Sequence, residues 1–327
     1  MARLSVLLFG KLSVRCNEDP LNGLTGSKVQ ELLCYLLLHR DRPHPRESLA
    51  ALLWADVPTV QSKKYLRQAL WQLQAALNAH PMACERRVLR IEPDWVRLNA
   101  EADLWIDAAA FERAYGRSQE MTCFQMKAAD ASALRGAVDL YQGDLLEGWY
   151  QEWCLCERER LQNMHLAMLD KLMDYSLAHQ DYEDGMKYGG RILRHDRARE
   201  CTHQRLMRLQ FFAGNRAGAL RQYQRCVAAL DEELGVQPAQ CTVALYEDVR
   251  LGRLEYTAAH LGIGGGGGGL ADVLSRLQQL ESSLDHLQQQ VRENIGAVGR
   301  LLASERQPSH QVATVTAAAL MRRASGA

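Results

Sequence analysis

The order of hydrophobic patterns in the first hundred residues constrains the fold more than any other feature. Residues 4–14 alternate apolar and polar positions around Gly10 and Lys11, which predicts two short strands joined by a turn. Apolar residues at helical spacing then predict helices over residues 27–39, 46–54 and 60–78, with Ser27 and Thr59 as N-caps of the first and third. Two β-prone runs flank the sequence Glu-Pro-Asp at 92–94 and predict a hairpin. This order indicates a winged helix-turn-helix domain.

The third of these helices has a positively charged outer face. No Asp or Glu occurs from Val57 to Cys84, although acidic and basic residues are equally numerous in the whole chain. At 100° per residue, the helix has a buried stripe of Leu66, Leu70, Leu73 and Leu77. The opposite face carries Gln61, Lys64, Gln68, Trp71 and Ala75, flanked by Arg67 and Gln72. Amide and cationic side chains on one helix suit the major groove of DNA, where Gln pairs with adenine and Lys or Arg with guanine or phosphate.

A candidate DNA-binding set follows from this face and from the arginines before the hairpin. Cations near the start of the third helix would bind phosphate where the helix dipole also attracts anions. The set is Gln61, Lys63, Lys64, Arg67, Gln68, Trp71, Gln72, Arg86, Arg87 and Arg90. Trp71 leaves three alternatives open: contact with a thymine methyl group, packing on the hairpin, or burial in a neighbouring domain.

The charge is unevenly distributed along the chain. The net charge is zero overall, but it is +5 in residues 1–100, −6 in residues 101–260 and +1 in residues 261–327. A basic first third indicates an anionic partner such as nucleic acid, with an ordinary solvated surface as the alternative. No run of about 18 apolar residues occurs, and none of the nine cysteines forms a Cys-x-x-Cys pair. We therefore expect a cytoplasmic chain with reduced thiols, no metal, no cofactor and no enzymatic activity, because no nucleophile–base spacing or phosphate loop is present.

The segment from residue 103 to about residue 260 is predicted to be helical throughout. Two stretches in it align at a constant offset of 34 residues, pairing Leu177 with Phe211, Gly185 with Ala219 and Ile192 with Cys226. An offset of 34 residues is the tetratricopeptide period, in which small residues let two antiparallel helices approach. The alignment predicts a tetratricopeptide-like domain of helical hairpins.

The last part of the chain has a different composition. Six glycines at 264–269 predict a flexible linker, since a phosphate loop would need a Lys and a Ser or Thr after them. From Leu270 to Leu301, nine of ten heptad seam positions are apolar, which predicts an oligomerising coiled coil; a lone amphipathic helix is the alternative. The oligomerisation residues would be Leu277, Leu280, Leu284, Leu287, Val291 and Asn294. Residues 304–327 are expected to be disordered.

Several motifs resemble those of a known family. "RESLAALLW", "SKKYLRQALWQL", "VLRIEPDWVRLN" and "ADLWIDAAAFERAY" are similar to the DNA-binding region of the SARP-type antibiotic regulatory activators. "GDLLEGWYQEWCLCERERL" and the stretch ending in "EELGVQP" resemble the bacterial transcriptional activator domain of that family. The resemblance covers about residues 1–252. Gln72 and Gln74 stand where the family commonly has arginines, and the glycine linker and coiled coil are not part of its usual pattern.

The resemblance implies a mainly α-helical protein that activates transcription by binding double-stranded DNA and touching RNA polymerase. The loop between the second and third helices would contact polymerase through Trp54, Asp56 and Thr59. The expected domains are a winged helix (1–102), a tetratricopeptide-like activator domain (103–260), the glycine linker (261–269), a coiled coil (270–303) and a tail (304–327). The alternative is a tetratricopeptide adaptor that uses its winged helix to bind protein.

Overall fold

The computed structural model describes residues 4–17, 19–21, 23–24, 26–78, 87–123 and 125–254. All of these belong to one unit, which spans residues 1–263. The predicted linker, coiled coil and tail lie outside the described residues, as do Arg86 and the six oligomerisation residues named above.

A small sheet opens the chain. Its strand order is β3 (Asp19–Pro20), β2 (Ser13–Cys16), β1 (Leu4–Leu7) and β7 (Leu104–Ile106). Strands β1 and β2 are antiparallel, and Gly10 lies between them with a φ of +81°, a backbone conformation that glycine adopts without strain. The predicted strands are confirmed. The prediction of helix from residue 103 is wrong for residues 104–106, because β7 returns to pair in parallel with β1.

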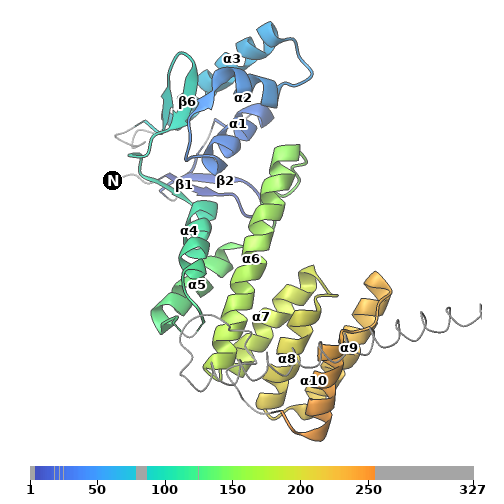
Figure 1. The fold of residues 1–327 in the computed structure, drawn as a ribbon. Helices are drawn as coiled ribbons and strands as arrows, with labels where there is room; N and C mark the ends of the chain where they lie inside the picture. Colours follow the sequence, from blue (N-terminus) through green and yellow to red (C-terminus); the bar gives the residue numbers. More distant parts are fainter. Residues whose placement is uncertain are drawn as a thin grey trace, which may run out of the picture. The chain divides into compact units, whose positions relative to one another are not determined.

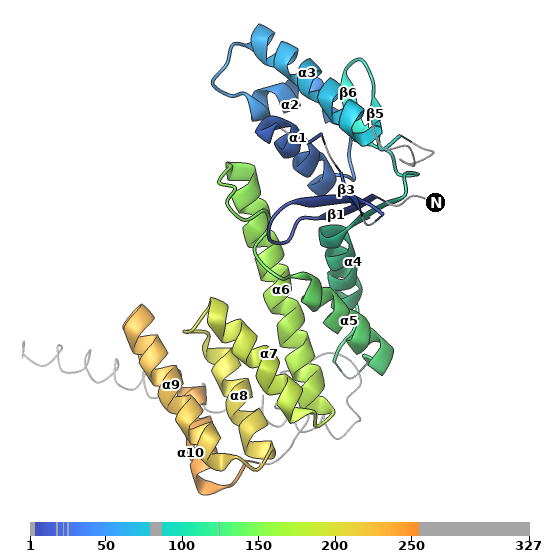
Figure 2. The same ribbon diagram turned by 180° about the vertical axis from the view of Figure 1, so that it is seen from behind.

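Three helices and a hairpin form the winged helix-turn-helix (Figure 2). The helices are α1 (Ser27–Leu38), α2 (Arg46–Leu53) and α3 (Thr59–Asn78). The hairpin pairs β5 (Leu89–Ile91) with β6 (Trp95–Leu98), and β4 (His44–Pro45) joins β6 on the other side. All four leucines of the predicted α3 stripe are buried. This part of the predicted fold class is therefore confirmed.

Two predicted helix caps are wrong. Ser27 is the first residue of α1, and Gly26 precedes it without a side-chain cap. Thr59 is likewise the first residue of α3, whose opening amides at Gln61 and Ser62 donate to the carbonyl oxygen of Pro58. Pro58, whose carbonyl oxygen accepts these first bonds, therefore takes the capping position, and the helix begins one residue earlier than the cap prediction assumed.

The rest of the described chain is helical (Figure 1). The helices are α4 (Asp107–Gln119), α5 (Ala128–Leu140), α6 (Glu152–Ala178), α7 (Tyr182–His195), α8 (Glu200–Phe212), α9 (Arg216–Leu234) and α10 (Gln240–Leu251). Helix α6 packs on α7, and α8 packs on α9, so the two aligned stretches are two helical hairpins.

The 34-residue register is confirmed by packing. Gly185 and Ala219 are both buried where their hairpins close, and a Cβ atom at Gly185 would lie 3.2 Å from the Cβ atom of Ser176 on α6, the partner helix in its hairpin. Ile192 and Cys226 are fully buried in equivalent positions. The assignment of these hairpins to the tetratricopeptide class stays a prediction.

Buried polar contacts join the N-terminal sheet to the helices. Asp107 is 1% exposed, and its carboxylate accepts hydrogen bonds from the backbone amides of Leu8 and Phe9 at 2.8–3.0 Å. The amide of Leu146 donates to the carbonyl oxygen of Leu8 at 2.8 Å. One apolar core runs through both parts, so the core is continuous across the expected domain boundary at residue 102.

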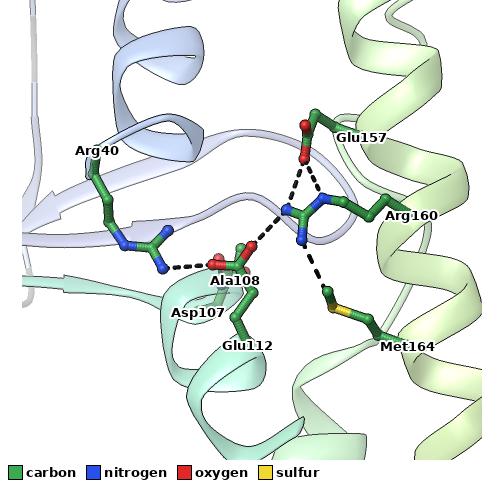
Figure 3. A network of polar contacts seen from close by, with 7 residues as sticks. All are labelled: Arg40, Asp107, Ala108, Glu112, Glu157, Arg160 and Met164. Atoms are coloured by element: carbon green, nitrogen blue, oxygen red, sulfur yellow. Dashed lines mark hydrogen bonds and ion pairs between the residues drawn. The ribbon is translucent and has the colours of Figure 1, made fainter. Parts of the chain in front are cut away.

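An ion-pair network ties the end of α1 to α4 and α6 (Figure 3). The carboxylate of Glu112 lies 2.5 Å from Arg40 and 2.5 Å from Arg160, and Arg160 also pairs with Glu157 at 2.7 Å. The indole Nε1 of Trp153 in α6 also donates a hydrogen bond to Glu31 Oε1, a buried carboxylate of α1, at 3.3 Å. These contacts connect the winged helix to α6, the longest helix of the described residues.

Candidate nucleic-acid interface

The predicted outer face of α3 is exposed. Gln61, Lys64, Arg67, Gln68 and Gln72 are all exposed, and Trp71 has 69% of its surface accessible. Trp71 therefore neither packs on the hairpin nor lies buried against another described segment. The face offers amide donors and acceptors next to cations, which is the chemistry that base edges and phosphates require.

Gln61 is partly engaged within the helix. Its amide Nε2 donates to the hydroxyl of Tyr65 at 2.6 Å, one turn further along α3. Gln61 would have to release this contact to reach a base. Gln68 has no such tie among the contacts of the described residues, which makes it the better placed of the two for reading bases.

A carboxylate from α2 reaches the cationic face. Glu47 accepts a hydrogen bond from Lys63 Nζ at 2.5 Å, and this contact lowers the pKa of Glu47. This pairing was not predicted from the sequence, because only the acid-free segment from residue 57 to residue 84 was considered there, and Glu47 lies before that segment. Both side chains are well exposed, so the pair is weak in water and a phosphate can compete for Lys63.

The hairpin is fastened beside α3 by the first residue of α2. The backbone amide of Arg46 donates to Asp94 O at 2.9 Å, and its guanidinium donates to Pro93 O at 3.3 Å. A cavity of about 500 Å³ lies between these elements. It is lined by Pro45, Arg46, Glu47, Lys63, Leu66, Arg67, Pro93, Asp94 and Trp95.

Arg46 and Trp95 were not included in the candidate DNA-binding set predicted from the sequence, although both line the cavity beside α3. Strand alternation could have identified Trp95 and Arg97, because Val96 between them is fully buried and its neighbours therefore point outward. Trp95 is 43% exposed. The position of Arg46 beside the hairpin depends on the tertiary fold and had no sequence signal.

Arg87 and Arg90, the described arginines of the candidate set near the hairpin, have different surroundings. Arg87 is exposed, and its carbonyl oxygen accepts a hydrogen bond from Asn99 Nδ2 at 2.9 Å, which holds the backbone there. Arg90 faces Glu101 at 3.8 Å, so its charge is partly compensated. Arg87 is thus the freer candidate for a phosphate contact.

The loop between α2 and α3 presents both polar and apolar groups. Asp56 and Thr59 are exposed, whereas Trp54 is partly buried with its ring 6.1 Å from that of Tyr65. Val60, next to the loop, is 86% exposed. Of the three predicted polymerase contacts, Trp54 thus supports the loop from inside, and the other two can meet a partner.

Other chemistry finds little support in the part of the chain that the structure describes. No group of three or more His, Cys, Asp or Glu side chains there is arranged to hold a metal ion. Five of the described cysteines are buried, and burial raises the pKa of the Cys226 thiol to about 11. Within the same ranges, no helix combines the length and the apolar character needed to cross a membrane.

Comparisons with known proteins agree with this architecture. Residues 106–250 match the Bacterial transcriptional activator domain. The chain is 27% identical over 241 residues to Regulatory protein AfsR of Streptomyces coelicolor; the match covers 71% of this chain but only 23% of that protein. The fold is similar to that of EmbR from Mycobacterium tuberculosis, solved in complex with a low affinity phosphopeptide, with a TM-score of 0.67 and 17% identity over 80% of this chain and 68% of that one. These findings confirm the resemblance to the SARP-type bacterial transcriptional activators, whose bacterial transcriptional activator domain is matched by residues 106–250.

Proposed function

We propose that this protein is a sequence-specific DNA-binding transcriptional activator that inserts α3 into the major groove. The observation that carries the proposal is the exposed face of α3, where Lys64, Arg67 and Gln68 lie beside a hairpin that carries further cations. A helix with this composition matches the groove in shape and in hydrogen-bonding groups.

The contacts divide into two kinds. Lys63, Arg67 and Arg87 would bind phosphates, which positions the protein but does not read sequence. Gln68 and Lys64, at the centre of the face, would read base edges. Gln72 and Gln74 supply no charge at the end of α3, so phosphate binding depends on the start of the helix and on the hairpin.

Activation would follow from contact with RNA polymerase through the loop between α2 and α3. Asp56 would be repelled by DNA phosphates, and Val60 offers an apolar contact beside it. The helical hairpins of α6–α9 would regulate this output, since the Glu112 network and Trp153 connect them to α1. The segment 270–301 would oligomerise the chain and raise its local concentration at paired sites.

The test is a comparison of two variants on DNA selected from random duplexes by the purified protein. Arg87→Ala should weaken all duplexes alike and reduce the slope of log K against log salt by about one unit. Gln68→Ala should cost about 1–3 kcal/mol on the selected site and little on random DNA. If neither variant changes affinity, or if the wild type binds no duplex at low salt, α3 is not a groove-binding helix.

The second candidate is an adaptor that binds protein through its winged helix. It is favoured by Trp71 and Val60, two large apolar side chains exposed on α3. Salt-dependent binding of duplex DNA by the wild type would exclude it, because an apolar protein contact does not release counterions. A Trp71→Ala variant with unchanged DNA affinity but a lost protein partner would favour it.

A further inference from the structure

A cavity of about 350 Å³ lies among α7, α8 and α9, helices that contribute nothing to the proposed DNA interface. Its apolar surface comes from Met186, Leu193, Leu206 and Ala229. Cavities that bind small molecules have volumes of roughly 300–1,000 Å³, are mostly apolar, and contain a few fixed polar groups. The volume and the apolar surface therefore fit a small ligand, and the polar groups indicate which one.

Two polar residues of the wall are buried and held in place by hydrogen bonds. His203 and Gln222 are each 3% exposed. His203 Nε2 lies 2.9 Å from the carbonyl oxygen of Arg197, and its Nδ1 lies 2.8 Å from Gln222 Nε2. The imidazole therefore donates through Nε2 and accepts through Nδ1, which orients the amide of Gln222 so that its oxygen faces Arg225 as an acceptor. This part of the wall is arranged before any ligand arrives.

The same cavity contains two arginines with unequal partners. Arg197 pairs with Glu232 at 3.0 Å and Glu233 at 3.7 Å. Arg225 makes one long hydrogen bond, 3.4 Å to Gln222 Oε1, and has no carboxylate within ion-pair distance among the described residues. Its guanidinium can therefore donate two parallel hydrogen bonds to the carboxylate of a ligand.

One further polar group of the cavity, the Oε1 atom of Gln210, lacks a partner among the described residues. Gln210 Oε1 is buried and accepts no hydrogen bond from the described residues. A buried acceptor without a donor is unfavourable and calls for an explanation such as a bound molecule. A ligand with an O–H or N–H group near Gln210 would satisfy it.

Two adjacent glycines in α7 differ in what a side chain at each position would meet. A Cβ atom at Gly189 would lie 2.6 Å from Leu206, so close helix packing requires that glycine. A Cβ atom at Gly190 would meet nothing within 4 Å, although Gly190 lines the cavity. A side chain introduced at Gly190 would therefore project into the open space of the cavity.

We propose that this cavity binds a small organic carboxylate with an apolar body and one hydrogen-bond donor. The carboxylate would pair with Arg225, the apolar body would lie against Met186 and Leu206, and the donor would reach Gln210. Such a site gives the helical-repeat domain a ligand to sense. Ligand binding does not depend on DNA binding, so either proposal can fail without the other.

Calorimetric titration of the full chain with three probes tests the proposal. The probes are 4-hydroxyphenylacetate, phenylacetate, which lacks the donor, and 2-(4-hydroxyphenyl)ethanol, which lacks the charge. We expect one site per chain and tightest binding of the first probe. Arg225→Gln should weaken it roughly tenfold and leave the uncharged probe unchanged, because only the charge-assisted contact is lost.

A blocking variant and a matched control keep the result independent of folding. Gly190→Leu places a side chain in the cavity and should abolish binding. Gly136→Leu should bind as the wild type, because Gly136 is also an exposed helical glycine at which a Cβ meets nothing within 4 Å and it lies outside the cavity. Absence of saturable binding by all probes, equal binding by Gly190→Leu, or equal affinity for charged and uncharged probes would overturn the proposal.

Discussion

Replacing Glu112 with glutamine is expected to lower the free energy of unfolding by about 2 kcal/mol, a value between those for exposed and fully buried ion pairs. Glu112 lies between Arg40 and Arg160 at 2.5 Å from each, and it keeps only 16% of its side chain exposed (Figure 3). The glutamine would keep the shape and one acceptor oxygen, but it would remove the charge and place an amide donor where the second oxygen accepts from an arginine. The change thus removes the charge together with one of the two hydrogen bonds.

The two arginines should not contribute equally. The Arg40 side chain is 22% exposed, and its Nη1 atom is already buried without a partner. Arg160 is 38% exposed and keeps Glu157 at 2.7 Å when Glu112 is changed. Breaking a buried pair is strongly destabilising because the remaining charge is uncompensated, whereas exposed pairs contribute about 0–1 kcal/mol. We expect a coupling of about 1.5 kcal/mol to Arg40 and about 0.5 kcal/mol to Arg160.

Double-mutant cycles measure these couplings. Urea unfolding of the full chain, followed by circular dichroism and tryptophan fluorescence, gives the free energy for each single and double variant, provided that the two signals coincide. Substitution of Arg40 and of Arg160 by Met keeps the aliphatic stem of each side chain. A cycle on Glu183 and Lys187 of α7 serves as the control, because those side chains are 83% and 61% exposed and should couple by less than about 0.5 kcal/mol.

The reasoning fails if the coupling of Glu112 to Arg160 equals or exceeds that to Arg40. It also fails if the network couples no more strongly than the control pair on α7. Either outcome would mean that the partial burial of Arg40 does not strengthen the ion pair.

Three further predictions concern other parts of the molecule. Burial raises the pKa of Asp174 from 3.8 to about 6 despite a nearby arginine, so the folded state binds the carboxyl proton more tightly than the unfolded state. Relative to Asp174→Asn, the wild type should lose up to about 3 kcal/mol of stability as the pH rises from 4 to 7. Parallel curves of stability against pH for the two proteins would contradict this. Asp56→Lys should reduce activated transcription in vitro without lowering DNA affinity, and loss of both together would count against a polymerase contact. Light scattering should show more chains per particle for the full protein than for a chain ending at Leu261, because the shortened chain lacks the apolar seam of residues 270–301. An equal number of chains per particle would rule out an oligomerising coiled coil.

Helical periodicity predicted the elements whose signal is local. The leucine stripe of α3 follows from a spacing of three and four residues, and every predicted stripe residue is buried. The hairpin at β5 and β6 followed from alternation around Glu-Pro-Asp. The 34-residue register also followed from the sequence, because small residues recur at the same place in the two hairpins and both, Gly185 and Ala219, are buried.

The candidate site was predicted in outline only. The exposed residues of α3 could be placed by their angle around the helix, since that angle depends on neighbours in sequence. The pairing of Lys63 with Glu47 and the position of Arg46 beside the hairpin could not, because they depend on how α2, α3 and the hairpin cross.

Tertiary structure alone decided where the N-terminal sheet ends. Residues 104–106 are too few to show a period, and they became strand β7 because β1 offered them a free edge. Asp107 then accepts the amide of Leu8, 99 residues away along the chain. Periodicity reports which face of an element is buried. It does not report which distant backbone group will need a hydrogen-bond partner once that face is buried, and that need determined the position of Asp107.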